Sequence, residues 1–277
     1  MAEKRVRSTL IIVVISICVF VTGLCTFKLL PMQSTLTAAF GIDDVAYGYL
    51  TSASNLFVIA FSIPFGFLCK KVNPKWTFLL GIGISLIGMV IEIFASNFVV
   101  FVVGRVLECG GSGFAVIVMY SLLANLVGNT KAGFWLSFMV VLTMVAQVAN
   151  TRGGTWLLVS EGIPYKTYFI GLLVLFVIIT ILWIVTVPAS LKISGTASDV
   201  KPTREQTLRV YKDKSNWLVT IAFGIFNLVS ISFPAYIIKF LTTKGMTEGE
   251  ASTIQSITTL VSIAAMLIFG VLSDRLK

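Results

Sequence analysis

The chain contains no histidine, few charged residues and only four cysteines. Charged residues make up 12% of its 277 residues, against roughly 25% in soluble domains. Without histidine, the chain lacks the side chain that most often binds metals or titrates near neutral pH. Its cysteines lie within or at the ends of apolar stretches and show no paired spacing: Cys18, Cys25, Cys69 and Cys109. We therefore expect no disulfide framework, no metal site and no cofactor.

Apolar sequence dominates the chain instead. Hydrophobic residues make up 57% of it, and the mean hydropathy is +0.96. Runs of about twenty apolar residues, long enough at ~1.5 Å rise per residue to cross a ~30 Å hydrocarbon layer, can be marked off eight times. The expected spans are 9–31, 46–69, 76–96, 98–123, 132–158, 167–188, 216–239 and 250–272. This pattern predicts an all-α membrane protein with about eight transmembrane helices.

The first run has an alternative interpretation as a secretory signal, because Lys4, Arg5 and Arg7 precede it. Its length, and the lack of a small-x-small cleavage site after it, favour a span that is retained.

The basic residues predict the orientation of the chain. With a cytoplasmic N-terminus, fifteen of the 21 lysines and arginines fall in cytoplasmic segments, and only Lys166, Lys239 and Lys244 fall outside. This bias predicts a multi-pass protein of the cell (inner) membrane whose N-terminus is cytoplasmic. The net charge of +9 is spread over several loops, whereas nucleic-acid binding requires one basic face. We expect the lipid bilayer as a partner and no nucleic acid.

Two similar segments, about two hundred residues apart, suggest that the chain has two related halves. Gly66–Lys71 and Gly270–Arg275 each place a glycine shortly before basic residues at the end of an apolar run. We expect a six-helix bundle over 1–188, a polar cytoplasmic linker over 189–215, and the start of a second bundle over 216–277.

These repeated segments resemble the loop signature of the major facilitator superfamily, approximately G-x-L-x-D-R-x-G-R-[KR]. The second copy matches it at Gly270, Leu272, Asp274 and Arg275. The first copy matches at Gly66, Leu68 and Lys71, with Lys70 where an aspartate is usual. In the fourth expected span, Arg105 and the glycines up to Gly113 resemble a second family feature, although Glu108 replaces a common glutamine and Cys109 a usual glycine. The Gly-Pro-x-x-Gly-Gly bend of many antiporters is only half present, at 150–154.

The resemblance implies twelve spans in two bundles of six, with the substrate bound between them. Because only eight spans are expected here, the chain is interpreted as a C-terminally truncated member, with a natural eight-span protein as the alternative. The loop motifs are expected to act as conformational latches, because Asp274 and Arg275 can form charge-assisted bonds to a neighbouring helix. Lys70 cannot accept such bonds, so the latch of the first copy is expected to be weaker or differently built.

Charged residues inside the expected spans are candidates for a substrate or proton pathway, because charges in hydrocarbon cost several kcal/mol. Lys28, near the end of the first span, either extends to the outer surface or lines a cavity. Arg105 and Glu108 lie three residues apart on one helical face. They form either a neutral structural pair or a site where proton affinity depends on substrate.

A further polar group lies in the outer half of the fifth span. Gln147, Asn150 and Arg152 are too close together for a lipid-facing surface. Arg152 either lines the cavity, which we favour, or closes the helix near Gly153. Glu92 is expected to be an interfacial anchor or an ion-pair partner.

Together these features predict a secondary active transporter that moves a small solute by alternating access. Lys28, Arg105 and Arg152 outnumber the two acidic residues inside the expected spans, which favours an organic anion or a zwitterion, and we expect proton coupling as a symporter or antiporter. No chemistry is expected to be catalysed. The alternatives are an uncoupled facilitator and a membrane assembly subunit that transports nothing.

Overall fold

The structure is a computed structural model that describes residues 2–52, 58, 65, 73–127, 132–189, 191, 209 and 212–275. Its α-helices are α1 (Ala2–Phe27), α2 (Gln33–Phe40), α4 (Pro74–Phe94), α5 (Phe98–Val127), α6 (Ala132–Ala149), α7 (Tyr165–Thr186), α9 (Lys214–Thr243) and α10 (Glu248–Arg275). A 3₁₀ turn, η1 (Leu30–Met32), follows α1, and two π-helical segments, η2 (Asn150–Gly154) and η3 (Trp156–Ser160), extend α6. The described ranges contain no strand, so the predicted all-α class is confirmed.

Five helical stretches within the described residues are long and apolar enough to cross a membrane. They are Ser8–Phe40, Pro74–Phe94, Phe98–Val127, Gly133–Ser160 and Tyr165–Thr186, and they correspond to the first, third, fourth, fifth and sixth predicted spans. Most of the second predicted span, 46–69, lies outside the described residues. Helices α9 and α10 occupy the positions of the seventh and eighth predicted spans but are not among the five. The count of eight therefore stays a prediction.

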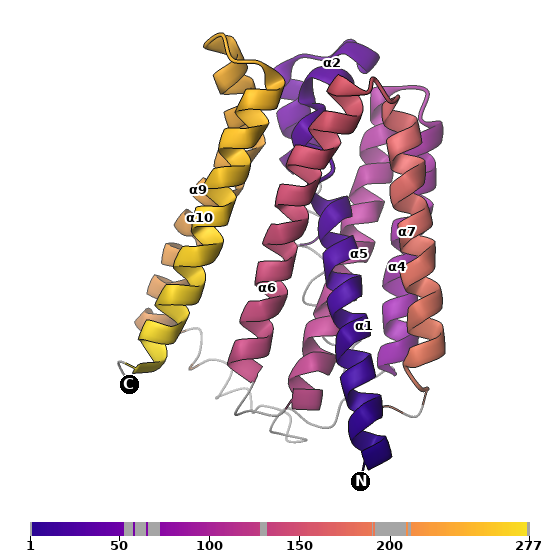
Figure 1. Ribbon diagram of the computed structural model, residues 1–277, viewed down its shortest axis with the longest axis vertical. Helices are drawn as coiled ribbons and strands as arrows, with labels where there is room; N and C mark the ends of the chain where they lie inside the picture. The colour runs from indigo at the N-terminus through magenta and orange to yellow at the C-terminus, as the bar shows by residue number, and fades with distance from the viewer. Residues whose placement is uncertain are drawn as a thin grey trace.

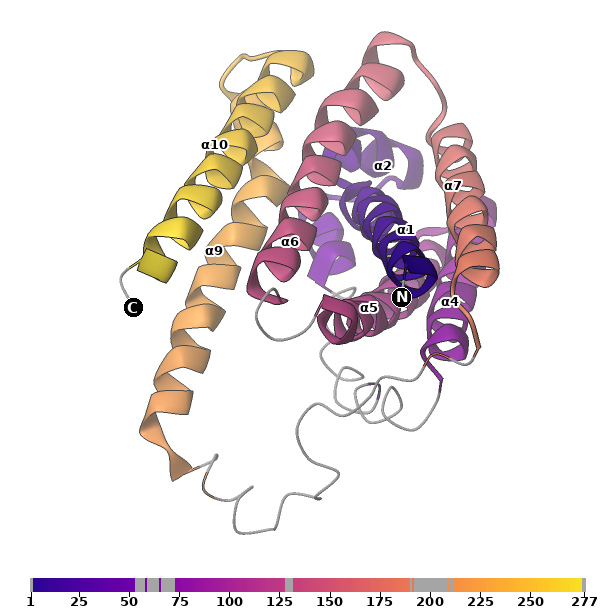
Figure 2. The same cartoon turned by 60° about the horizontal axis from the view of Figure 1, so that its bottom comes forward.

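The helices of the first half form one bundle, and α9 and α10 form a hairpin beside it (Figure 1). Helix α1 packs against α5, α6 and α7, while α4 packs against α5 and α7. The hairpin contacts the bundle mainly through α10, which packs against α6 and η2. Figure 2 shows the hairpin on the side of the bundle where α6 lies. In Figure 1 the hairpin approaches the bundle at the end opposite the N-terminus and diverges from it toward the other end.

Local sequence sets several helix ends. Asn73 accepts a hydrogen bond from the Lys75 amide at 2.9 Å, and Pro74 follows it in the first turn of α4; both are preferred at these positions. Gly41 ends α2 in the left-handed conformation with φ 63°, which glycine adopts without steric cost. These local signals fix where the helices begin and end, and packing then fixes how they meet.

Aromatic side chains join the helices of the bundle. Phe78 of α4 stacks on Trp183 of α7 with ring centroids 3.8 Å apart. At the end opposite the N-terminus, Phe40 of α2 lies 5.2 Å from Phe101 of α5, which in turn lies 6.0 Å from Phe169 of α7. All five rings except that of Phe40 are fully buried. Helix α2 therefore covers that end of the bundle.

Helices α4 and α5 approach so closely that their backbones touch at glycines. A Cβ atom built on Gly88 would lie 2.4 Å from the Glu108 amide nitrogen and 2.5 Å from the Gly104 carbonyl oxygen. About two helical turns away in each helix, a Cβ on Gly111 would lie 2.3 Å from the Gly81 carbonyl oxygen. Small residues allow this approach between membrane helices. The same contact brings Glu92 of α4 next to the charged residues of α5.

We expect Gly88→Ala to lower stability, because its methyl group would meet backbone atoms of α5 that cannot move independently. Overpacking of this kind costs about 1–3 kcal/mol. Gly83→Ala is the matched control, since it lies in the same helix and a Cβ added there would have nothing within 4 Å of it; there alanine should be neutral or stabilising. Thermal unfolding of the purified variants in detergent measures the difference, and equal melting temperatures would contradict the close contact.

Candidate functional site

Four charged side chains meet inside the first-half bundle and are called here the buried charge cluster: Lys28, which follows α1, Glu92 near the end of α4, and Arg105 and Glu108 of α5. Lys28 Nζ pairs with Glu92 Oε2 and lies 2.8 Å from Glu108 Oε2. Arg105 Nη1 lies 2.7 Å from the same Glu108 oxygen. No side chain of the cluster is more than 4% exposed. The two positive and two negative charges cancel, as burial requires.

The cluster lies at the point where α1 ends inside the bundle. The last carbonyl groups of a helix have no intrahelical partner, and here side chains from other elements supply one. Arg105 donates from Nη1 to the Cys25 carbonyl at 3.1 Å and from Nη2 to the Thr26 carbonyl at 2.7 Å. Just after the end of α1, Tyr47 donates its hydroxyl to the Leu29 carbonyl at 2.6 Å. The partial negative charge of the helix end also favours Arg105 and Lys28 there.

The cluster leaves three polar atoms without a protein partner. Glu92 Oε1, Glu108 Oε1 and Arg105 Nε are buried and make no hydrogen bond within the described residues. A buried group left unpaired costs about 1–3 kcal/mol. The two carboxylate oxygens can accept a proton or a hydrogen-bond donor without displacing an existing partner. A proton on either carboxylate would leave the cluster with one net positive charge and weaken its attraction to Lys28.

A second polar group, at η2, also binds the end of α1. Asn150 donates its side-chain amide to the Leu24 carbonyl and accepts a hydrogen bond from the Tyr168 hydroxyl of α7. Gly154 lies against Pro31, since a Cβ there would come 2.8 Å from the proline Cγ. π-Helical turns are rare and often occur at functional sites. In this chain, the π-helical segment holds Asn150 inside the bundle while Arg152 faces α10.

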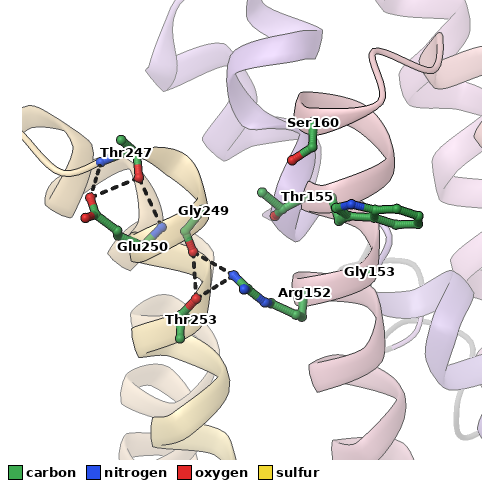
Figure 3. Close-up of a pocket in the computed structure, with 9 residues that line it drawn as sticks. Arg152, Gly153, Thr155, Ser160, Thr247, Gly249, Glu250 and Thr253 are labelled. Atoms are coloured by element: carbon green, nitrogen blue, oxygen red, sulfur yellow. Dashed lines mark hydrogen bonds between the residues drawn. The ribbon is translucent and has the colours of Figure 1, made fainter.

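Arg152 contributes to a cavity between the two halves, called here the α10 cavity (Figure 3). Its volume is about 580 Å³, and its lining residues are Arg152, Gly153, Thr155, Trp156, Ser160, Thr247, Gly249, Glu250 and Thr253. Arg152 Nη1 donates to the Gly249 carbonyl at 2.9 Å and to Thr253 Oγ1. In Figure 3 the Arg152 side chain reaches from the helix of the first half to α10. The hydrogen bonds of Arg152 therefore connect the two halves directly.

Helix α9 also contacts the first half at this end of the molecule. Lys239 Nζ lies 3.8 Å from Asp44 Oδ1, with both side chains partly exposed. A Cβ added to Gly48 would lie 2.6 Å from the Tyr236 hydroxyl oxygen. Exposed ion pairs contribute little stability on their own.

Comparison with known proteins agrees with this arrangement of helices. Residues 15–277 match the family model of the Major Facilitator Superfamily. The chain belongs to this superfamily. Among solved structures, a bacterial homologue of the human lysosomal transporter Spinster, in an inward-facing and unoccupied conformation, superposes with a TM-score of 0.80 at 14% identity. A bacterial homologue of human drug peptide transporters gives a TM-score of 0.55 at 14% identity. At these identities the two structures support the fold alone.

The matched proteins are longer than this chain. The superposition on the Spinster homologue covers 97% of this chain and 63% of that one, and the second covers 96% and 56%. Dehydrocurvularin exporters from Alternaria cinerariae and Aspergillus terreus are 31% and 30% identical over 123 residues. Those alignments cover 42% of this chain and 21% of each exporter. The chain thus matches about a fifth of the exporters' length.

The structure decides against one of the two possibilities for Lys28. Extension to the outer surface is wrong, because Lys28 is completely buried, lies 4.1 Å from the Phe169 ring centroid, and pairs with Glu92 and Glu108. Its position on a cavity wall stays a prediction. The expected local pair of Arg105 and Glu108 is present, and Glu92 is the ion-pair partner that the sequence suggested. The cluster's function in a superfamily transporter is not tested by these contacts.

The other predicted site residues are separated from the cluster. The polar group expected around the fifth span is divided, because Gln147 and Asn150 are buried whereas Arg152 is exposed at the α10 cavity. The suggestion that the helix closes near Gly153 is wrong, since it continues through η3 to Ser160. Sequence reasoning missed Tyr47 and Tyr168, whose hydroxyls carry no periodic signal that would distinguish them from core aromatics.

The loop motifs of the superfamily are only partly described. Gly66, Leu68 and Lys71 lie outside the described residues. Gly270, Leu272, Asp274 and Arg275 lie in the last turns of α10, where the structure describes the backbone. Their latch role stays a prediction. Within the described residues no group of histidine, cysteine or acidic side chains is arranged to bind a metal.

The charge balance of the cluster can be tested by a double-mutant cycle. Lys28→Met leaves one uncompensated negative charge and Glu92→Gln leaves one positive charge, and each should destabilise the chain by about 3–5 kcal/mol. The double variant is neutral again and should lose clearly less than the sum of the two. Thermal unfolding in detergent measures all four proteins. Additive losses would show that Lys28 and Glu92 do not form a compensating pair.

Proposed function

We propose that the chain acts as a secondary active transporter that moves a small organic anion or zwitterion across the membrane and couples this movement to protons. The buried charge cluster is the observation that carries the proposal. It places two carboxylates and two cations inside a membrane bundle, where such residues are costly and usually serve a pathway for ions or substrates. Membership of the superfamily supports transport rather than catalysis.

The geometry of the cluster supports proton coupling. Glu108 Oε2 forms ion pairs with both Lys28 and Arg105. The other carboxylate oxygen of Glu108, Oε1, and Glu92 Oε1 have no hydrogen-bond partner among the described residues. Protonation of Glu108 would weaken two ion pairs at once and release Arg105, which also binds the end of α1. In this proposal, proton binding changes how firmly α1 is held, and α1 packs against three helices of the bundle.

The positions of the halves support an inward-facing state. The described contacts of Arg152 and Lys239 join the halves at the end opposite the N-terminus, and the Spinster homologue is inward-facing. With the cytoplasmic N-terminus inferred from the basic residues, these contacts lie on the outer side of the cell membrane. Alternating access would then require them to break when the outer side opens.

Two alternatives make different predictions. An uncoupled facilitator would use the same fold but move solute without protons. An assembly subunit would use α9 and α10 as a contact surface, since many apolar side chains of α9 are exposed, and would move no solute.

Glu108→Gln distinguishes these functions in proteoliposomes that contain a trapped pH-sensitive dye. Amino acids and monocarboxylates are added outside, one at a time, and both solute uptake and internal pH are recorded. We expect the natural chain to move protons with a solute and the variant to lose proton movement and accumulation. Glu161→Gln, at an exposed position outside the cluster, should behave as the natural chain. Solute uptake that persists unchanged in Glu108→Gln would identify an uncoupled facilitator. If the natural chain itself takes up no solute, the assembly subunit would be favoured.

The latch at the end of α10 gives a separate prediction. Asp274 is proposed to accept charge-assisted hydrogen bonds from a neighbouring helix, whereas Lys70 in the first copy cannot accept them. Asp274→Asn should therefore slow uptake in the same proteoliposomes, while Lys70→Asn should have a smaller effect. Unchanged transport in Asp274→Asn would rule out the latch.

A further inference from the structure

A second cavity, of about 570 Å³, lies between α1 and α6 and is called here the α1–α6 groove. Apolar and aromatic side chains dominate its lining, among them Ile12, Val13, Ile17, Phe20, Trp135 and Phe138. Ser16 also lines it, but its hydroxyl donates to the Ile12 carbonyl at 2.9 Å. Val13 and Ile17 are 48% and 41% exposed, so the groove opens at the surface. Among the described residues no charged side chain lines it, and it offers a ligand mainly apolar contact.

The groove has the length of one membrane leaflet. Both of its helices belong to stretches that are long and apolar enough to cross a membrane. Its lining on α1 runs from Thr9 to Phe20, which corresponds to about 16 Å along the helix axis. Half of a hydrocarbon layer is ~15 Å thick. Beyond Phe20 the two helices touch, because a Cβ added to Gly23 would lie 2.9 Å from the Cβ of Ala146. The groove therefore ends near the middle of the layer.

The other end of the groove lies at the start of both helices, which begin at the same end of the molecule (Figure 1). Trp135 lies in the first turn of α6, and its ring meets that of Phe138 edge to face at a centroid distance of 5.8 Å. Tryptophan is enriched at the boundary between hydrocarbon and headgroups. This end of the groove is therefore at the level of the lipid headgroups.

Basic residues precede the groove at this end. Lys4, Arg5 and Arg7 occupy the first turns of α1, directly before the lining begins at Thr9. Arg5 precedes Thr9 by four residues, so the two positions share a face of the helix. Glu3 is the one acidic residue in these turns, which keep a net positive charge. Basic clusters beside a membrane span attract anionic lipids.

We propose that the α1–α6 groove binds one acyl chain of an anionic phospholipid, whose headgroup lies at the basic first turns of α1. The apolar lining suits the chain, the length of the groove suits a single leaflet, and the charge at its open end suits the phosphate. With the N-terminus inferred to be cytoplasmic, the lipid comes from the cytoplasmic leaflet, which is rich in anionic lipids. This binding goes beyond the proposed transport function and does not rest on it.

Trp135 provides a reporter for the test. The full chain is reconstituted into phosphatidylcholine vesicles that contain increasing fractions of phosphatidylglycerol with brominated acyl chains, which quench nearby tryptophans. The chain has five tryptophans, so the Trp135 signal is the difference between the natural chain and Trp135→Phe. We expect this signal to be half quenched at an about fivefold lower fraction of brominated phosphatidylglycerol than of brominated phosphatidylcholine.

A larger side chain in the groove should exclude the acyl chain. Val13→Phe should therefore reduce the quenching of the Trp135 signal by both lipids. Val174→Phe is the matched control, because Val174 lies in α7, is 52% exposed and does not line the groove. It should be quenched as the natural chain is. Melting temperatures in detergent check that both variants fold.

The headgroup part of the proposal is tested by replacing Lys4, Arg5 and Arg7 together with glutamine. Quenching by brominated phosphatidylcholine should persist, while the preference for phosphatidylglycerol should disappear. Lys166→Gln, at an exposed position at the start of α7, removes a basic residue elsewhere and should keep the preference.

Three results would overturn the proposal. Equal half-points for the two brominated lipids would mean that the groove is an unselective lipid-facing surface. Normal quenching in Val13→Phe would place the acyl chain elsewhere, and a preference that survives the triple glutamine variant would place the headgroup elsewhere. Lipid binding is read without any solute, so its failure leaves the transport proposal standing, and a failure of transport leaves the lipid site standing.

Discussion

The end of α1 inside the bundle is the constraint on which the rest of the structure depends. A helix that stops away from water leaves carbonyl groups that must find donors. Here the carbonyls of Leu24, Cys25 and Thr26 are bound by Asn150 and Arg105, and the carbonyl of Leu29, just after the helix, is bound by Tyr47. These donors come from three different parts of the chain. The end of α1 thereby joins the buried charge cluster, the π-helical segment and the residues that follow α2.

The close contact between α4 and α5 completes the cluster. Glycines at 81, 88, 104 and 111 bring the two backbones together, which places Glu92 beside residues of a helix that it could not otherwise reach. A larger residue at any of these positions would separate the helices and leave a buried charge without its partner. Stability and the proposed proton coupling therefore depend on the same packing.

The buried charge cluster and Arg152 act on different parts of the molecule. The buried charge cluster holds helices of the first half to one another, whereas Arg152 holds the first half to α10. Asn150 and Arg152 are two residues apart in η2, so one π-helical segment contacts both the end of α1 and the second half. The hydrogen bond to the end of α1 and the hydrogen bonds to α10 therefore come from the same short segment.

The sequence by itself determined the all-α class, the membrane location, the family and the pairing of Arg105 with Glu108. Apolar run length, motif spacing and helical periodicity are local properties, so one chain displays them directly. Only the tertiary structure decided that Lys28 is buried against Glu92, 64 residues away, and that Asn150 and Arg152 point to different partners. Those outcomes depend on glycine contacts between helices and on a π-helical segment that shifts the register of side chains. The glycines recur at helical spacing in each helix, but that spacing does not say which helix they meet, and the π-helical segment has no periodic signature.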